Sequence, residues 1–455
     1  MIKKTAFFIL FFLIVFTGKA SGEEIYVQNS TELHKALQQT GSGHQQVIKL
    51  APGEYQGNFI VKNSVHIIGE EGAQITGPDQ GSVLTIEADD VIVEGLQIEG
   101  GGSQNAGIYI KGNRSYVHHN VFKNVFHGIY AHESYGHRFE TNVISSFSDI
   151  KKHKGYGIYL AKAPNTVITN NFVHDTQDGV YVSYSDNCQV NGNQMIRARY
   201  GVHTMDSRNV MISNNQVRES INGLMIMQSY EISMINNFFY LNTKIDGAGM
   251  FVFDTFDSTI SSNIVMNNSK GLLLENAKRN QIEFNMFFGN NIGLEIRQGS
   301  ENNIIYLNNF YKNTNQIISA KDNQNQFSRD QYGNFFDDHR SLNINQDDTV
   351  DYAYKSGDVF YNMSSNEPYL QIFYKSPAVE LWNMIERYTP IPSDTFIIDE
   401  FPLAQPAPFQ WGNSTNNSPE MKSKDFSSIQ ILFFLLVFGA SILIIWSARS
   451  EKHEA

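Results

Sequence analysis

The sequence predicts an all-β protein, a right-handed parallel β-helix (solenoid) followed by a C-terminal transmembrane helix. Two observations lead to this prediction. A short strand motif that begins with glycine recurs roughly every 22 residues between Gly107 and Gly293. Near the C-terminus, an apolar run is long enough to span a membrane. Because a solenoid grows by adding rungs to one continuous core, the 455 residues need not divide into several globular domains.

The repeat is clearest at Gly179-Val180-Tyr181-Val182. Each similar unit starts at a glycine, and the steps lengthen near residues 145–154 and 244–247, where we expect insertions. The glycines are Gly107, Gly128, Gly157, Gly179, Gly201, Gly223, Gly249, Gly271 and Gly293. The short strand-like pieces are too brief for helix-pair repeats. We therefore assign residues 23–335 to the β-helix.

An asparagine precedes most of these glycines at a constant spacing. The set is Asn120, Asn142, Asn171, Asn193, Asn215, Asn237, Asn263, Asn285 and Asn308, where Asn142 and Asn308 require allowance for an insertion and a one-residue slip. Asparagine tolerates left-handed turns, and stacked amides can hydrogen-bond from rung to rung. We interpret these residues as structural. The first and third residues after each glycine are nearly all apolar, so they face the core.

The second residue after each glycine should face outward, yet this column is largely aromatic. It contains Tyr109, Tyr130, Tyr159, Tyr181 and, further along, Phe251. Apolar surface of this kind marks either a binding face or a face covered by another segment. Both interpretations stay open for the tyrosines, and stacking on sugars is one form of binding that they allow.

Two rungs of the same outward face carry a different chemistry. His203-Thr204-Met205 precedes Met225-Ile226-Met227 by one repeat, so His203 and Met205 should lie beside Met225 and Met227. Neighbouring rungs are about 4.8 Å apart. Imidazole and thioether groups suit Cu(I), which makes these four residues our candidate metal ligands. The alternative is a hydrophobic patch that happens to contain methionine.

Other histidines are weaker candidates. His127 and His132 border neighbouring strands of the same face. His118 and His119 are adjacent in sequence, so strict alternation along a strand would point them to opposite faces and exclude a shared site.

Both ends of the chain are predicted to be targeting segments. Residues 1–22 combine Lys3 and Lys4 with a short apolar run and small residues, as in a signal peptide. After an extension at 336–411 that we expect to pack on the β-helix, residues 412–426 form a polar linker. Residues 427–447 form the transmembrane helix, and residues 448–455, which include Arg449 and Lys452, form a cytoplasmic tail. The body is thus expected on the extracytoplasmic side of a cell membrane, held by a single pass.

Composition narrows the possible functions. The net charge is −12 and no basic stripe is visible, which argues against a nucleic-acid partner. The chain has a single cysteine, Cys188, which excludes an intramolecular disulfide framework. We expect Cys188 to be a small buried residue of the core. Polysaccharide chemistry needs paired carboxylates or acidic calcium ligands. Glu275 and Glu295 on the outward face match this requirement only weakly, and no epimerase-like Asp-Pro-His motif is present.

The repeats, with Gly-Val-His-Thr-Met followed by Gly-Leu-Met-Ile-Met, resemble the NosD family. The resemblance extends beyond them to Gly333-Asn334-Phe335-Phe336, to Ser376-Pro377-Ala378-Val379 and to Pro402-Leu403, and spans residues 51–406. It implies an exported, copper-associated protein that is not an enzyme. The implied partners are an ABC transporter permease and ATPase, together with a copper chaperone or apo-nitrous oxide reductase.

The residues and the resemblance together suggest one hypothesis and one alternative. The hypothesis is an extracytoplasmic scaffold for maturation of the copper centre of nitrous oxide reductase, with transient copper binding at the His/Met patch. The alternative is a carbohydrate-binding or polysaccharide-modifying β-helix that uses the tyrosine stripe.

Overall fold

The computed structural model describes residues 24–408, except for 40–45, 148–152, 321–323, 340–341, 357–359, 361–362, 364–367, 374–375 and 389–396. The predicted signal peptide, linker, transmembrane helix and cytoplasmic tail lie outside the described residues. Within the described ranges, no helix is both long and apolar enough to cross a membrane.

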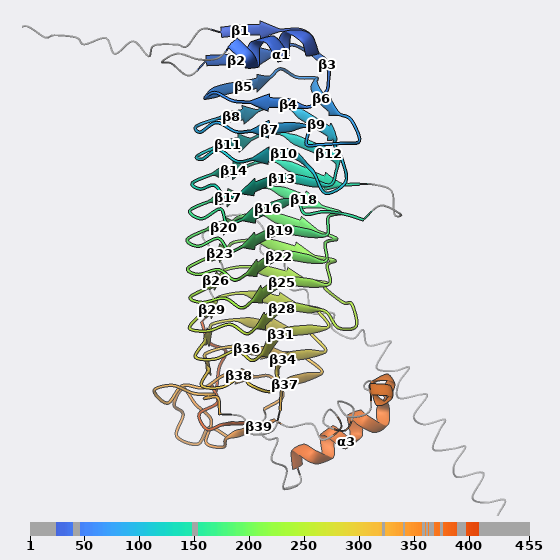
Figure 1. The fold of residues 1–455 in the computed structure, drawn as a ribbon. Helices are drawn as coiled ribbons and strands as arrows, with labels where there is room; N and C mark the ends of the chain where they lie inside the picture. The colour runs from blue at the N-terminus through green and yellow to red at the C-terminus, as the bar shows by residue number, and fades with distance from the viewer. Residues whose placement is uncertain are drawn as a thin grey trace, which may run out of the picture. The chain divides into compact units, whose positions relative to one another are not determined.

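The described chain winds into a right-handed parallel β-helix with three strands in each rung (Figure 1). One early rung consists of β2 (Gln46–Leu50), β3 (Gly53–Gln56) and β4 (Phe59–Val61). Corresponding strands of successive rungs pair in parallel and form sheets of 13, 12 and 13 strands. The predicted fold class of the repeat region is therefore confirmed.

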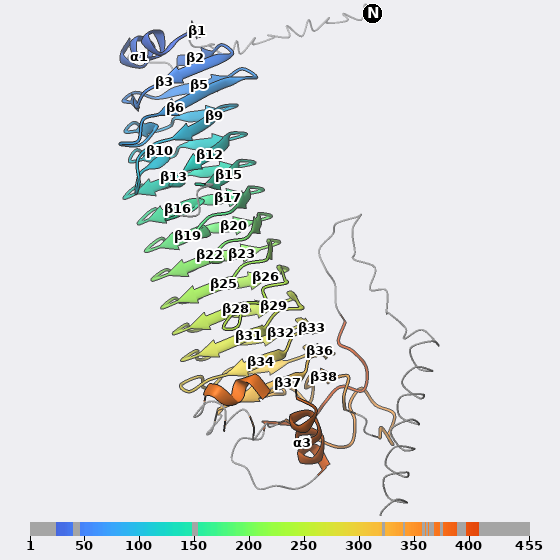
Figure 2. The ribbon, with the colours of Figure 1, turned by 90° about the vertical axis from the view of Figure 1, so that its right-hand side faces the viewer.

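The 12-stranded sheet, called the central sheet below, contains the glycine motifs of the repeat. Its strands are β4, β7 (Leu84–Ile86), β10 (Ala106–Ile110), β13 (His127–His132), β16 (Ile158–Ala161), β19 (Asp178–Ser183), β22 (Tyr200–Met205), β25 (Asn222–Met227), β28 (Ala248–Phe253), β31 (Lys270–Glu275), β34 (Ile292–Ile296) and β37 (Asn315–Ser319). Figure 2 shows these strands stacked rung upon rung.

Close stacking explains the repeated glycine. A Cβ atom at Gly179 would lie 2.5 Å from the carbonyl oxygen of Gly201 and 2.6 Å from Cγ of Met195. The same conflict recurs at Gly201 and Gly223, where the next glycine carbonyl is 2.6 and 2.5 Å away. Any larger residue would therefore push neighbouring rungs apart.

The asparagine column forms a continuous hydrogen-bonded ladder inside the turns. Asn193 donates its backbone N–H and its Nδ2 to Oδ1 of Asn215, at 2.9 and 3.1 Å, and Nδ2 also donates to the Ile168 carbonyl. The pattern runs from Asn120 to Asn308, so the structural interpretation is confirmed. Each buried amide is thus paired, which avoids the cost of an unsatisfied polar group.

A helix that the sequence analysis did not predict packs at the N-terminal end of the solenoid. Helix α1 (Ser30–Gln39) begins after Asn29, whose Oδ1 accepts the backbone N–H of Glu32 at 3.0 Å. Leu33, Ala36 and Leu37 are buried, and their spacing places them on one face. This apolar face packs beside β1 (Glu24–Val27), β3 and β4, as the blue end of Figure 1 shows.

At the other end, the extension adds a two-stranded antiparallel sheet, β39 (Tyr354–Ser356) with β40 (Ile397–Asp399). Tyr354 stacks on Phe336 of the last rung strand, β38 (Phe335–Phe336), with ring centroids 3.6 Å apart. The extension also contains a 3-10 helix, η1 (Pro368–Phe373), and α3 (Pro377–Tyr388).

The ladder ends on a carboxyl group from this extension. Asn308 bonds to Asn334, and Asn334 donates its N–H and Nδ2 to Oδ2 of Asp399 at 2.7 and 3.0 Å. The N–H of Phe401 donates to the other oxygen of Asp399 at 3.1 Å. Asp399 therefore occupies the place of a further asparagine acceptor.

Replacing one ladder residue should destabilise the whole stack. Asn215→Ala leaves the N–H and Nδ2 of buried Asn193 without their acceptor. We expect the free energy of unfolding to fall by about 2–4 kcal/mol, since unsatisfied buried groups are costly. Urea denaturation followed by circular dichroism measures the loss. Asn214→Gly is the matched control, because Asn214 is exposed with φ of 55°, and an equal loss there would contradict the ladder's role.

Asp399 should make the stability of this end depend on pH. Burial raises the pKa of Asp399 to about 7 from its ordinary 3.8. Between these values the folded chain retains a proton that the unfolded chain has released, so stability falls as pH rises through this window. Asp399→Asn removes this titration. We expect the stability of the variant, relative to that of the parent chain, to increase between pH 5 and pH 8. The difference between their urea midpoints measures this change, and a difference that stays constant with pH would contradict the argument.

Candidate functional site

The central sheet brings most of the predicted binding and metal residues into one outward column, and it places Met205 and Met227 in the next outward column. The register pairs Tyr181 with His203, His203 with Met225, and Met225 with Phe251. Towards the N-terminus, the same column continues through Tyr159, Tyr130 and Tyr109. The insertions between rungs leave this register unchanged.

The tyrosines of this column form a stacked ladder. Tyr130 and Tyr159 have ring centroids 4.5 Å apart with planes 12° apart, and Tyr159 and Tyr181 are 5.0 Å apart with planes 2° apart. Tyr109 joins the ladder at 5.1 Å from Tyr130. All four side chains are half-buried. Burial raises the pKa of Tyr159, so its phenol is neutral near pH 7.

Two neighbouring rings partly cover the middle of this ladder. Tyr156 packs edge-on against both Tyr159 and Tyr181, with each centroid pair 5.0 Å apart. His127 packs against Tyr156 and accepts its backbone N–H at Nδ1, at 3.0 Å. Burial lowers the pKa of His127 to about 4, so the ring is neutral. The ladder is thus neither fully open nor fully covered.

His203 extends the stack and is held from behind by a carboxylate. Its ring lies 4.3 Å from that of Tyr181, with planes 10° apart. Nδ1 of His203 lies 3.0 Å from Oδ2 of Asp178, which is itself clamped by Nε and Nη2 of Arg199 at 2.8 Å each. The Asp178 side chain is fully buried. In the tautomer that this contact favours, Nδ1 carries a proton and donates it to Asp178, and Nε2 carries the lone pair.

That remaining nitrogen is the most informative atom of the site. His203 is only 5% exposed, and within the described part of the chain its Nε2 has no hydrogen-bond partner. A buried nitrogen without a partner is costly unless it has a ligand to bind. Because His203 is on the outward side of its strand, the sequence suggested an exposed ring. The ring is instead buried, since it stacks on Tyr181 and its centroid lies 5.2 Å from that of Tyr200.

The three methionines lie on the same two strands as this histidine and its pairing partner, β22 and β25. Met225 is paired with His203 and is also 5% exposed, whereas Met205 and Met227 are paired with each other and partly exposed. The Tyr181 hydroxyl donates to Sδ of Met205 at 3.4 Å. The structure therefore places all four predicted ligands together on β22 and β25.

The sequence analysis missed Asp178 and Arg199. Asp178 stands directly before a repeat glycine, at a position that Tyr200, Asn222 and Ala248 occupy in the following rungs. The sequence did contain a signal for this ion pair: a charged residue beside the core-facing motif, followed by an arginine one rung later. At metal sites, a ligating histidine commonly donates its other ring N–H to a carboxylate, which fixes the orientation of the ring.

The donor set fits a soft metal ion and does not resemble a closed zinc site. Among the described residues, no group of three or more His, Cys, Asp and Glu side chains is arranged to hold a metal. One imidazole with thioethers instead matches the preference of Cu(I). The residues thus fit copper by the chemistry of their donors and by the partnerless Nε2.

The carboxylates that favoured polysaccharide chemistry are held in ion pairs. Glu295 is buried, 3.1 Å from Nζ of Lys270 and 2.7 Å from Nε of Arg297. Arg297 also holds Glu275 at 2.9 Å. Both carboxylates are therefore engaged with basic side chains of the same sheet.

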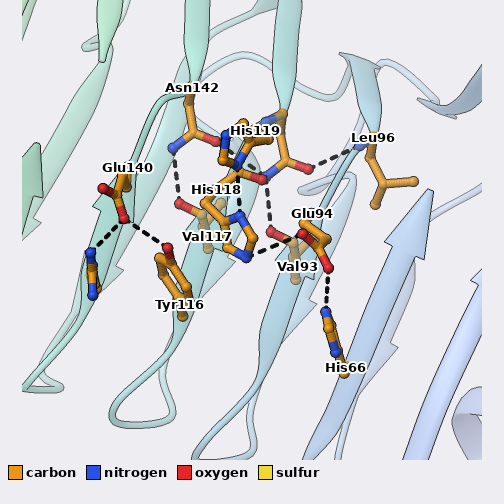
Figure 3. A network of polar contacts seen from close by, with 12 residues as sticks. His66, Val93, Glu94, Leu96, Tyr116, Val117, His118, His119, Glu140 and Asn142 are labelled. Carbon is orange, nitrogen blue, oxygen red and sulfur yellow. Dashed lines mark hydrogen bonds and ion pairs between the residues drawn. The ribbon is translucent and has the colours of Figure 1, made fainter. Parts of the chain in front are cut away.

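The expectation that His118 and His119 face opposite sides is wrong. Strand β11 (Tyr116–His118) ends at His118, and His119 has a left-handed φ of 55°, so strand alternation no longer applies. Their Nδ1 atoms lie 2.8 Å apart (Figure 3). His132, another of the weaker candidates, forms a hydrogen bond between its Nδ1 and the Tyr109 hydroxyl, at 3.3 Å.

Fold and site together define a class of protein, a parallel β-helix whose outward aromatic ladder ends in imidazole and thioether groups. Residues 142–341 match a family model described as periplasmic copper-binding protein (NosD). Two relatives, each named probable ABC transporter binding protein NosD, are 34% identical. That of Pseudomonas aeruginosa aligns over 79% of this chain and 89% of its own length; that of Stutzerimonas stutzeri aligns over 78% and 86%. This chain belongs to the NosD family.

A solved structure supports the fold alone. The A-module of the mannuronan C-5 epimerase AlgE6 from Azotobacter vinelandii aligns with a TM-score of 0.56 at 13% sequence identity. The alignment covers 65% of this chain and 93% of the module.

Histidine tautomers test the geometry of the site without any metal. His203 should carry its proton on Nδ1, because Asp178 accepts there. Buried His137 is the matched control with the opposite tautomer, since its Nδ1 accepts the Ser115 N–H and its Nε2 donates to the Ser134 hydroxyl. Long-range ¹H–¹⁵N correlation of histidine-labelled protein distinguishes the two. The same tautomer at both histidines would contradict the arrangement.

Proposed function

We propose that this chain is an extracytoplasmic accessory protein that binds Cu(I) and supports assembly of the copper centre of nitrous oxide reductase together with an ABC transporter. The single observation that carries the proposal is the buried, partnerless Nε2 of His203, a residue that pairs with Met225 and lies next to the Met205–Met227 pair. In this proposal the chain holds and passes on a metal ion and is not an enzyme.

The roles of the residues follow from their contacts. Asp178, clamped by Arg199, holds the His203 ring through Nδ1, so that Nε2 is left to act as a ligand. Met225 supplies a buried thioether beside it, and Met205 and Met227 supply thioethers nearer the surface. Thioethers bind Cu(I) without the disulfide exchange that affects cysteine outside the cell.

The gradient of exposure suits transfer better than storage. His203 and Met225 are buried, while Met205 and Met227 are partly exposed. A donor or acceptor protein can therefore exchange ligands with the outer thioethers before the ion reaches or leaves the inner pair. The half-buried tyrosines that continue the same column supply an aromatic surface against which such a partner can dock.

Family membership supports the partners in this proposal. The relatives are named as ABC transporter binding proteins. A membrane span at residues 427–447 would hold the solenoid beside a permease and raise its effective concentration there. The cytoplasmic ATPase would then act through the permease, and the copper chaperone or apo-reductase would meet the solenoid outside the membrane.

A second candidate function rests on the tyrosine ladder alone. Parallel rings with a partly exposed edge can stack on sugar rings, so glycan binding is the alternative for this face. The ion pairs at Glu275 and Glu295 argue against hydrolysis or elimination by this sheet. Loss of glycan binding in Tyr130→Ala and Tyr159→Ala, with no Cu(I) binding by the parent chain, would favour this alternative.

Cu(I) binding tests the site directly. The full chain in detergent should retain one Cu(I) against a chromophoric chelator, and a His203, Met205, Met225 and Met227 quadruple alanine variant should lose it. Asp178→Asn should lower the affinity by about 10–100-fold, as expected for a residue that orients a ligand. Met211→Leu and Met266→Leu, on the other two sheets, are the matched controls. Retention of Cu(I) by the quadruple variant would overturn the site.

Reductase maturation tests the cellular role separately. Cells that depend on this chain should produce nitrous oxide reductase with reduced copper content when they carry the quadruple variant, and normal enzyme when they carry either control. Normal copper content in the quadruple variant, together with lost Cu(I) binding in vitro, would refute the maturation role and leave the metal site standing.

A further inference from the structure

A cluster of histidine and glutamate side chains lies on the 13-stranded sheet that begins with β1. Histidine and glutamate alternate over four rungs, at His66 of β5 (Val65–Gly69), Glu94 of β8 (Ile92–Glu94), His118 of β11 and Glu140 of β14 (Arg138–Glu140). Figure 3 shows these side chains side by side. None of them belongs to the central sheet, so the proposed function leaves them unexplained.

His119 joins this cluster because of its backbone. With φ of 55°, the chain turns at His119 and brings its ring back towards the preceding residue. The two rings meet edge to face at 81°, with Nδ1 of each 2.8 Å from the other. His119 lies one residue before a ladder asparagine, and the equivalent left-handed positions of later rungs hold Asn170, Asn214 and Asn236. The backbone conformation therefore does not require histidine at this position.

Glu94 orients the inner imidazole from the opposite side. Its Oε2 lies 3.5 Å from Nε2 of His118, and its Oε1 lies 2.7 Å from Nε2 of His66. Charge attraction places the proton of neutral His118 on Nε2, towards this carboxylate, so the Nδ1 lone pair is directed to His119. The His118 side chain is 12% exposed, whereas His119 is exposed and accessible from solvent.

The spacing of the two nitrogens suits one shared ion. With metal–nitrogen bonds of about 2.0–2.1 Å, two ligands at a right angle lie about 2.8–3.0 Å apart, and tetrahedral ligands lie about 3.3–3.4 Å apart. The observed 2.8 Å corresponds to the right angle, which is typical of tetragonal Cu(II) and Ni(II). The exposed ring of His119 can rotate to direct its own lone pair to the ion.

We propose that His118 and His119 chelate a divalent first-row transition ion through their Nδ1 atoms, with Glu94 as a positioning residue. Two imidazoles leave the remaining coordination positions to water or to a ligand from a partner. The order of affinity is Cu(II) above Ni(II) and Zn(II). This site is independent of the proposed function, because nitrogen donors select divalent ions whereas the thioethers of the central sheet select Cu(I).

The test uses the purified full chain, titrated in air with Cu(II), Ni(II) or Zn(II) by equilibrium dialysis. His119→Asn should remove one bound ion per chain, and it should preserve the fold because asparagine occupies the equivalent turn elsewhere in this chain. His118→Thr is a second variant, chosen because Thr169 occupies the equivalent strand position two rungs later. Glu94→Gln should weaken binding by about 10–100-fold.

His132→Asn, on the central sheet, is the control and should bind as the parent does. Electron paramagnetic resonance of the Cu(II) form should show hyperfine structure from two nitrogens that disappears in His119→Asn. Unchanged stoichiometry and affinity in His119→Asn for all three ions would overturn the proposal and leave the 2.8 Å contact as an imidazole–imidazole hydrogen bond. Circular dichroism confirms that each variant is folded.

Discussion

The rest of this structure depends on the amide hydrogen bond that links each ladder asparagine to the next. The bond fixes the vertical register of the rungs, because each Oδ1 accepts two donors from the preceding asparagine and each Nδ2 also bonds a backbone carbonyl of an earlier rung. A one-residue slip would break these bonds and turn every core side chain outward. Each bond contributes only about 1 kcal/mol net, but its absence would leave buried groups unpaired.

Because the register is fixed, residues one repeat apart in the sequence lie side by side on the candidate binding face. His203, Met225 and Phe251 lie in one column although the step from β25 to β28 is longer than the step before it, because the extra residues loop out between rungs. The same holds between Tyr130 and Tyr159. Insertions can therefore vary without moving the ligands, and the site tolerates change in length but not change in register.

Periodic features could be predicted from the sequence, and features that break the period could not. The glycine motif, the asparagine ladder and the His/Met rungs all follow from spacing. Asp178 and Arg199 were missed because they lie at or just before the start of a strand, where alternation is a poor guide to direction. His118 and His119 were misplaced for a related reason, since the strand ends at His118 and the next residue is left-handed. Asp399 completes the ladder from 65 residues beyond Asn334, a contact that no repeat encodes.

Donor chemistry separates the two proposed metal sites more effectively than distance along the chain. At His203 a buried carboxylate leaves one imidazole nitrogen among thioethers, a set that favours the reduced, soft ion. At His118 and His119 the donors are two nitrogens open to water, a set that favours divalent ions. Both rely on a carboxylate behind a histidine, so the selectivity lies in the other ligands. Under the two proposals, one solenoid would hold Cu(I) and a divalent ion on different sheets without the sites competing for the same ion.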